Sequence, residues 1–163
     1  MTTKLMSSLL ILLSVLLSGS LFAQDQNRTD DKILQDYFAA NKIKPSITPS
    51  GLYYLITTPG TGENCKRGQK VTMSYRGKLI DGKLFDGNVD ENFKLIQGRQ
   101  PFTFNLGMGQ VIRGWDEGVQ LLKMGSRGTL YIPSSLGYGA AGAGGVIPPN
   151  AVLIFDVEVT AVN

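Results

Sequence analysis

The sequence predicts an α+β domain in which a curved antiparallel sheet of five to six strands wraps over one short helix. Five runs rich in aromatic and β-branched residues, as strands are, lie between glycine-containing segments: 52–58, 70–76, 103–106, 128–132 and 152–160. The last run alternates at Phe155, Val157 and Val159, which is typical of a half-buried antiparallel strand. Helical spacing interrupts the runs at 111–122, so the sheet is expected to close its apolar face over that helix.

The composition allows one globular domain and excludes several kinds of catalysis. The chain has 163 residues, and 42% of them are hydrophobic, enough to bury a core. It has no histidine, which excludes Ser-His-Asp and Cys-His catalysis. Its single cysteine, Cys65, cannot form an intrachain disulfide; we interpret it as a small loop residue, with a reactive thiol as the alternative. The formal charge of +3 comes from scattered Lys and Arg, so no nucleic-acid surface is predicted.

Residues 1–23 have the layout of a secretory signal peptide. Lys4 precedes the apolar run 9–17, and small residues lead to Ala23, after which cleavage is expected. An uncleaved membrane anchor is the alternative, but the apolar run has only about half of the ~20 residues that a spanning helix requires. We therefore predict an exported protein, periplasmic or secreted, with no stable membrane insertion after cleavage.

Residues 24–50 are predicted to form a short lead-in helix and a linker before the main domain at 51–163. Four apolar residues share one face of this helix: Ile33, Leu34, Tyr37 and Phe38. Pro45 follows the helix and ends it. The apolar face is expected to pack on the domain, and a dimerisation or docking helix is the alternative.

Seven short motifs carry a resemblance to a known family. They are TMSYRG at 72–77, GKLFD at 82–86, PFTFNLG at 101–107, VIRGWDEG at 111–118, YGAAG at 138–142, IPP at 147–149 and LIFDVE at 153–158. They occur in the order seen in FKBP-type peptidyl-prolyl cis-trans isomerases, and the chain resembles this family over 51–162. One such motif alone would be a weak signal, whereas seven in order are specific.

The resemblance implies a rotamase that accelerates rotation about X-Pro bonds in exported proteins as they fold. Uncatalysed exchange takes tens to hundreds of seconds because the planar amide is stabilised by resonance. Twisting the bond lowers the dipole of the carbonyl, so a dry aromatic pocket favours the twisted state over the planar state. This mechanism requires neither a metal nor a cofactor, and neither is expected. The implied partners are proline-containing polypeptides, with macrolides as inhibitors.

By the same resemblance, eleven residues form the pocket. Trp115 would be its floor, and Asp86 its polar wall group, paired with the Tyr75 hydroxyl. The Ile112 backbone N–H and the Tyr138 hydroxyl would donate hydrogen bonds to carbonyls of an extended peptide. The implied catalytic residues are Asp86, Tyr75, Phe85, Trp115, Tyr138 and Phe155, and the implied substrate-binding residues are Phe102, Val111, Ile112, Val146 and Ile147. Without the motifs, each aromatic residue would be interpreted as core packing.

Two segments depart from the compact family pattern. Fourteen residues separate Asp86 from Pro101, and the insert at 88–98 is expected to add a bulge or a lip to the pocket. In the flap, Ala143-Gly144 stands where the compact form often has a larger side chain and a proline. Phe104 is expected to face away from Phe102, or to form a secondary rim, and it is not included among the predicted site residues.

Other functions fit the sequence less well. A non-catalytic module that grips proline-containing segments as a chaperone is the main alternative. A hydrolase using Ser134 or Ser135 would lack a base at motif spacing. The run GYGAAG at 137–142 spells the dinucleotide fingerprint, but the prolines that follow it preclude the helix which that fingerprint requires. The acids near Asp86 are interpreted as part of a solvated loop and not as a cation site.

Overall fold

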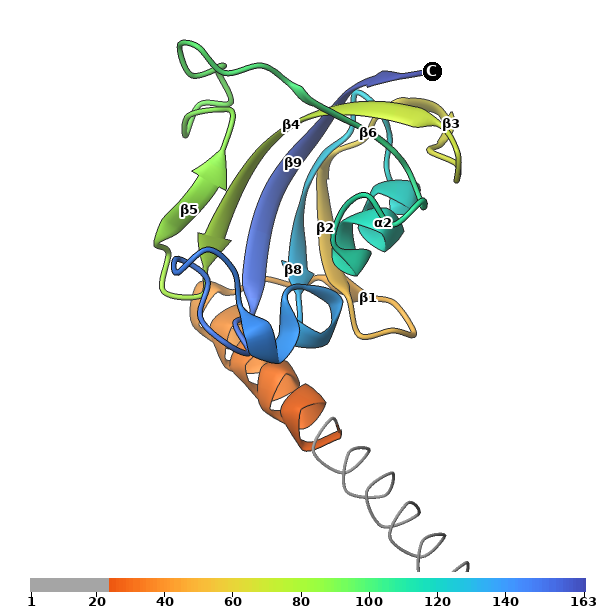
Figure 1. Ribbon diagram of the computed structural model, residues 1–163. Helices are drawn as coiled ribbons and strands as arrows, with labels where there is room; N and C mark the ends of the chain where they lie inside the picture. The colour runs from red at the N-terminus through yellow and green to blue at the C-terminus, as the bar shows by residue number, and fades with distance from the viewer. Residues whose placement is uncertain (1–23) are drawn as a thin grey trace, which may run out of the picture.

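The computed structural model describes residues 24–163, and the predicted signal peptide at 1–23 lies outside the described residues. The main sheet has seven strands in the order β1-β2-β8-β9-β4-β5, with β6 also paired to β4, and all pairs are antiparallel (Figure 1). These strands are β1 (Ser46–Ile47), β2 (Tyr53–Thr58), β4 (Lys70–Leu79), β5 (Leu84–Gly87), β6 (Phe102–Asn105), β8 (Arg127–Ile132) and β9 (Leu153–Val162). A second, two-stranded sheet pairs β3 (Thr61–Asn64) with β7 (Lys123–Met124).

The predicted α+β class is confirmed, but the sheet has more strands than the five or six expected. All five predicted runs are strands, and the additions to the main sheet are β1 and β5. β1 has only two residues, and β5 contains Asp86 and Gly87, residue types that are depleted in strands. Neither element has an apolar alternation that could have revealed it. β5 forms because the ten-residue β4 is long enough to pair with β6 along one half and with β5 along the other.

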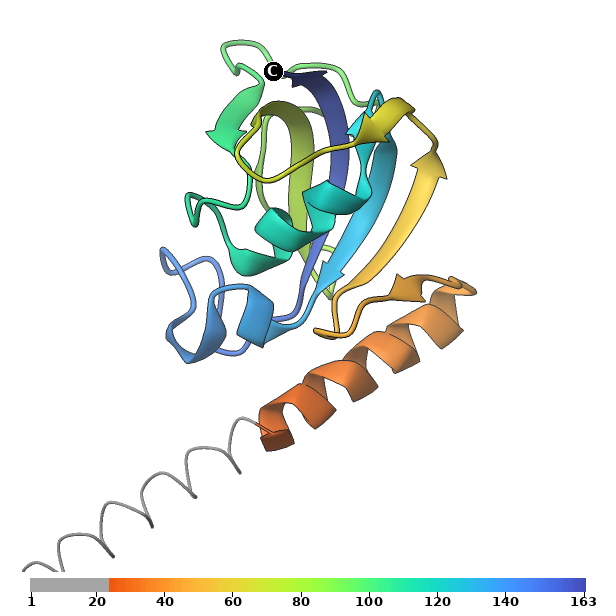
Figure 2. The same ribbon diagram turned by 90° about the vertical axis from the view of Figure 1, so that its right-hand side faces the viewer.

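The predicted helix at 111–122 is shorter in the structure. α2 covers Arg113–Gly118 and continues as the 3₁₀ turn η1 (Val119–Leu121). It crosses the concave face of the sheet (Figures 1 and 2), and Trp115 and Val119 are buried there. The helix lies unusually close to β8, since a Cβ atom at Gly114 would come within 2.6 Å of the Ile132 side chain. That close approach sets the depth at which Trp115 enters the core.

The predicted lead-in helix packs on the opposite, convex face of the sheet (Figure 2). Its described part covers 24–41, so it is longer than the short helix expected. The Phe38 ring lies edge-on to two strand residues, with ring centroids 5.1 Å from Tyr53 and 4.9 Å from Tyr131. Leu34 is fully buried beside them. The apolar face therefore packs on the domain, as predicted, and builds a second core.

This helix ends through its backbone before it reaches Pro45. Lys42 takes a left-handed conformation with φ of 56°, and the Ile43 N–H donates to the Phe38 carbonyl at 2.9 Å. Together with the longer bond from the Lys42 N–H to the Ala39 carbonyl, this is a Schellman ending, which satisfies carbonyls left free by the last turn. Across 24–163, none of the helices is both long enough and apolar enough to span a membrane.

Candidate active site

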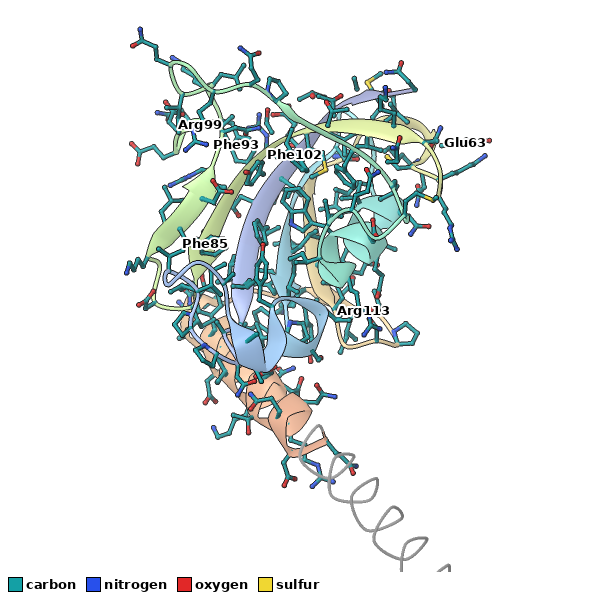
Figure 3. The ribbon with its side chains drawn as sticks, viewed as in Figure 1. Glu63, Phe85, Phe93, Arg99, Phe102 and Arg113 are labelled. Atoms are coloured by element: carbon teal, nitrogen blue, oxygen red, sulfur yellow. The ribbon has the colours of Figure 1, made fainter. Side chains whose placement is uncertain are left out.

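A cavity of about 200 Å³ opens between the concave face of the sheet, the start of α2 and the segment after β8. Phe85 reaches it from β5 and Phe102 from the start of β6 (Figure 3). Ten residues line the cavity: Tyr75, Phe85, Asp86, Phe102, Gln110, Val111, Ile112, Trp115, Tyr138 and Phe155. Nine of the eleven residues implied by the resemblance are thus brought together, although they come from six separate stretches of the chain.

The floor of the cavity is an aromatic cluster around Trp115. The Trp115 ring meets Tyr75 at 5.0 Å and Phe155 at 5.1 Å between centroids, both nearly perpendicular. Phe85 packs edge-on to Phe155 at 5.5 Å. Such edge-to-face contacts place positive ring edges against negative ring faces, which fixes the rings relative to one another. The Trp115 Nε1 atom has no hydrogen-bond partner within residues 24–163, so the indole offers a buried donor beneath an otherwise apolar floor.

A glycine in β4 makes room for two phenylalanine rings against the sheet. Gly77 pairs with Phe155 on β9 and with Asp86 on β5. A Cβ atom at Gly77 would come within 2.6 Å of the Phe155 ring and 2.7 Å of the Phe85 ring. The absent side chain is therefore part of the shape of the wall.

Asp86 supplies the only carboxylate among the lining residues, and it is hydrogen-bonded on both oxygens. The Tyr75 hydroxyl donates to Oδ2 at 2.7 Å, the pairing expected from the resemblance, and the Gly87 N–H donates to Oδ1 at 2.8 Å. Burial, and then the bond to Asp86, raises the pKa of Tyr75 well above its usual value. Burial and the nearby charge of Asp86 also raise the pKa of Tyr138. Both phenols therefore remain protonated donors near neutral pH.

The mouth of the cavity has two donors suited to an extended peptide. Tyr138 is 39% exposed, and its hydroxyl has no hydrogen bond to any residue of 24–163. Ile112 is the N-cap of α2: its carbonyl accepts from the Trp115 N–H at 2.9 Å, whereas its own N–H has no acceptor within the described residues. Both groups are placed as the resemblance implies, and either could donate to a carbonyl.

Val146 and Ile147 are not among the residues that line the cavity, contrary to expectation. Ala143 and Ile147 exchange both backbone hydrogen bonds at 2.9 Å, which closes a tight turn in the flap. This turn directs Ile147 into the main core, where it is 6% exposed. Val146, at the tip of the turn, is 47% exposed. The sequence motif could not reveal this, because adjacent residues in such a turn point in different directions.

Gln110 was not predicted to lie at the cavity, and Phe104 was predicted in the wrong place. Gln110 precedes the VIRGWDEG motif, and its side-chain oxygen accepts from the Asn105 N–H at 2.8 Å, which turns it toward the cavity. Phe104 was expected on the other face from Phe102 or at a secondary rim, but residues two apart in a strand share a face. It is buried, stacks on Phe102 at 5.7 Å and lies 5.9 Å from Trp115, so it supports the floor from behind.

The motif residue Asp116 holds the loop that leads to α2. Its two carboxylate oxygens accept from the Gly107 and Gly109 N–H groups, each at 2.8 Å. This anchors the segment that carries Gln110 and Val111 to the cavity. Asp116 itself is absent from the lining, so its contribution is to the shape of the site.

The insert at 88–98 folds over the convex face of the sheet. Asn88 is buried and bonds to the Tyr75 N–H, the Met73 carbonyl and the Gln100 carbonyl, which fastens both ends of the insert to β4. Phe93, labelled in Figure 3, reaches back from the insert. Its ring lies under the Arg127 guanidinium, whose central carbon is 4.2 Å from the ring centroid. Neither a lip nor a bulge of the insert lines the cavity.

Cys65 lies in the loop between β3 and β4, as predicted, but its side chain is buried in the main core. It is 4% exposed within the main core, and burial raises the pKa of its thiol. Both effects oppose the thiolate form that a reactive cysteine needs.

Within residues 24–163 no group of three or more Cys, Asp or Glu residues is arranged to hold a metal ion. Asp90, one of the acids considered for a cation site, instead accepts from the Asn92 and Lys94 N–H groups of its own loop.

Comparison with known proteins places this chain in a family of enzymes. Residues 61–160 match the family described as "FKBP-type peptidyl-prolyl cis-trans isomerase". The chain is 50% identical over 101 residues to the FK506-binding protein of Neisseria meningitidis serogroup C, covering 62% of this chain and 86% of that protein. It is 48% identical over 113 residues to FK506-binding protein 4 of Dictyostelium discoideum, covering 69% of this chain but only 29% of that longer protein. The crystal structure of FkpA from Escherichia coli matches with a TM-score of 0.69 and 31% identity, over all of this chain and 73% of FkpA.

Proposed function

This chain belongs to the FKBP-type peptidyl-prolyl cis-trans isomerase family, and we propose that it accelerates X-Pro rotation in exported polypeptides while they fold, in the cavity above Trp115. The observation that carries the proposal is an aromatic cavity with one bonded carboxylate–phenol pair at its wall. Its volume is about 200 Å³. A site of this size suits one proline ring and the adjoining amide.

The donors at the mouth would align the substrate before rotation. The Tyr138 hydroxyl and the Ile112 N–H lie at the mouth of the cavity, and neither has an acceptor within residues 24–163. Each would donate to a carbonyl of the extended peptide, so the proline ring would point toward Trp115. The Asp86 carboxylate is held in place by two donors, so it would orient the substrate.

The rotation itself would be accelerated by the dry aromatic wall. The amide barrier of ~18–20 kcal/mol comes from resonance that gives the planar bond a large dipole. Water stabilises that dipole. The twisted amide has a smaller dipole, so it loses less hydration free energy on entering an apolar site. Rings from Tyr75, Phe85 and Phe155 surround the floor, so the planar state would lose more hydration than the twisted state.

A protease-coupled isomerisation assay with an X-Pro peptide tests this function. We expect turnover well above the solvent rate, and a loss in kcat/KM of about 10- to 100-fold, or ~1.4–2.7 kcal/mol, in Asp86→Leu and in Phe155→Ala. The matched control is Glu91→Leu, at an exposed acid of the insert that does not line the cavity. A folded but inactive wild-type protein that still binds proline-containing peptides would instead favour the chaperone module.

Export is the second part of the proposal. It rests on the arrangement of residues 1–23, where a charged start, an apolar run and small residues precede the domain. The mature protein would be periplasmic or secreted and would begin at Gln24. N-terminal sequencing of protein from the periplasm or the medium tests this. Recovery of the intact chain in the membrane fraction would contradict it.

Macrolides of the FK506 class are proposed as competitive ligands of the same cavity. The support is the name of these relatives, FK506-binding protein, together with the aromatic cavity of this chain. We expect FK506 to inhibit the assay and to lose affinity in Phe155→Ala. FK506 binding that is unaffected by this substitution would place the ligand elsewhere.

A further inference from the structure

Asp30, on the N-terminal helix, is a fully buried carboxylate outside the cavity. Its Oδ1 accepts from Gln26 Nε2 at 2.7 Å, and its Oδ2 accepts from the Ser134 N–H at 2.8 Å and from Ser134 Oγ at 2.6 Å. No Lys or Arg of residues 24–163 pairs with it. Burying a charge without a cation is costly unless hydrogen bonds replace its hydration. Attachment of the helix does not require this charge, because the aromatic cluster around Phe38 already provides apolar contact.

The partner of Asp30 starts the segment that carries Tyr138. Ser134 is the first residue of the 3₁₀ turn η2 (Ser134–Leu136), and the residue before it is Pro133, which has no side-chain oxygen to cap the turn. The cap therefore comes from Asp30, 104 residues away in sequence, and it is charge-assisted, the stronger class of hydrogen bond. Figures 1 and 2 both show the N-terminal helix running beneath this blue segment.

The position of Tyr138 depends on this turn. The Gly137 N–H donates to the Ser134 carbonyl at 3.0 Å, so the residue before Tyr138 is tied directly to the residue that Asp30 holds. On the other side, the Asn150 N–H donates to the Gly139 carbonyl at 2.8 Å. Since the Tyr138 side chain makes no hydrogen bond of its own within 24–163, the backbone on either side sets where its hydroxyl lies.

We infer that Asp30 is a positioning residue for the isomerase site: it fixes η2 from the opposite face of the sheet and thereby holds the Tyr138 hydroxyl at the mouth of the cavity. The inference rests on the proposed function, in which this hydroxyl donates to the substrate. It gives the N-terminal helix a role in activity in addition to its role in packing.

The test compares neighbouring acids on the same helix. Asp30→Ala removes the cap, and we expect kcat/KM to fall about three- to tenfold, the effect of one misplaced hydrogen bond. Asp30→Asn keeps an oxygen for Ser134 and should recover most of that loss. The matched control is Asp31→Ala: Asp31 accepts from the Tyr53 hydroxyl at 2.5 Å and does not bond to η2, so kcat/KM should stay within about twofold.

A double-mutant cycle separates positioning from general damage. In the Tyr138→Phe background, which lacks the hydroxyl, Asp30→Ala should cause less than about a twofold further loss. Equal losses in both backgrounds would overturn the inference. If Asp30→Ala fails to fold, Ser134→Ala removes one of the same bonds and enters the same cycle.

NMR contacts between the Tyr138 ring and the cavity give a readout that does not need turnover. We expect them to weaken in Asp30→Ala and to persist in Asp31→Ala. Contacts that are unchanged in Asp30→Ala would refute the positioning role of Asp30 even in an active enzyme. An inactive wild-type protein whose Tyr138 contacts still depend on Asp30 would count against the proposed function and leave the positioning role intact.

Discussion

At the scale of single residues, the phenols of this protein differ in what surrounds them. Tyr75 and Tyr138 lie at the cavity beside Asp86, whereas Tyr131 belongs to the aromatic cluster on the convex face. Burial is the largest cause of a raised pKa at each of them, and it raises the pKa of Tyr131 to about 12. The neutral phenol is thus the form that the fold accommodates, which suits a site that works by donating hydrogen bonds.

This predicts a loss of stability in strong alkali. An unfolded tyrosine titrates near pH 10 and the folded Tyr131 near 12, so the folded state holds its proton more tightly. Its contribution is complete below pH 10 and is lost as the pH rises toward 12. Denaturant unfolding at a series of pH values should show this fall, and Tyr131→Phe should make it shallower. Since lysines also titrate in this range, the difference between the two proteins is the readout, and parallel curves would contradict the prediction.

At the scale of elements, the path of β4 determines the shape of the cavity wall. Its backbone at Gly77 is opposite Phe155 on one side and Asp86 on the other. The Phe155 and Phe85 rings occupy the space that a side chain at Gly77 would fill. The shape of the wall therefore depends on the absence of a side chain at Gly77, which leaves room for both rings.

Gly77→Ala should consequently damage the site more than its size suggests. Both rings would have to shift, and overpacking of this kind costs about 1–3 kcal/mol of stability. We expect kcat/KM to fall about tenfold because the aromatic wall is displaced. Thr72→Ala, on the same strand but outside the cavity lining, is the control and should retain activity. Chemical denaturation and the isomerase assay measure both effects, and an Ala variant with normal turnover would show that the wall tolerates the displacement.

The sequence predicted elements wherever burial leaves a pattern, and failed where geometry is set by contacts between distant residues. β9 was evident because apolar residues alternate at Phe155 and Val157, which face the core. β5 had no such alternation, and the flap turn that removes Val146 from the cavity depends on a bond between residues four apart. The bond from Asp30 to Ser134 joins positions 104 residues apart, a separation at which no local pattern operates. The motifs identified most of the cavity residues, but only the structure showed the contacts that hold those residues in place.

At the scale of the whole molecule, one sheet carries two cores. The concave face holds the main core and the cavity, and the convex face holds the cluster under the N-terminal helix (Figure 2). The two cores share strands: Leu130 and Phe155 point inward, whereas their neighbours Tyr131 and Ile154 point outward. Because strand residues alternate between faces, neither core can come apart without loosening the other.

Phe38→Ala tests this coupling. Phe38 is 4% exposed between Tyr53 and Tyr131, and truncating a buried phenylalanine costs about 3–5 kcal/mol. We expect unfolding to remain a single transition when it is followed both by Trp115 fluorescence and by circular dichroism, with the free energy of unfolding lowered by this amount. At temperatures where the variant is folded, kcat/KM should change by less than about threefold, because Asp30 still holds Ser134 two helical turns away. Lys32→Ala, on the exposed side of the same helix, is the control. Two separate transitions, with the helix melting before Trp115 reports any change, would mean that the faces are independent and that the helix only covers the sheet.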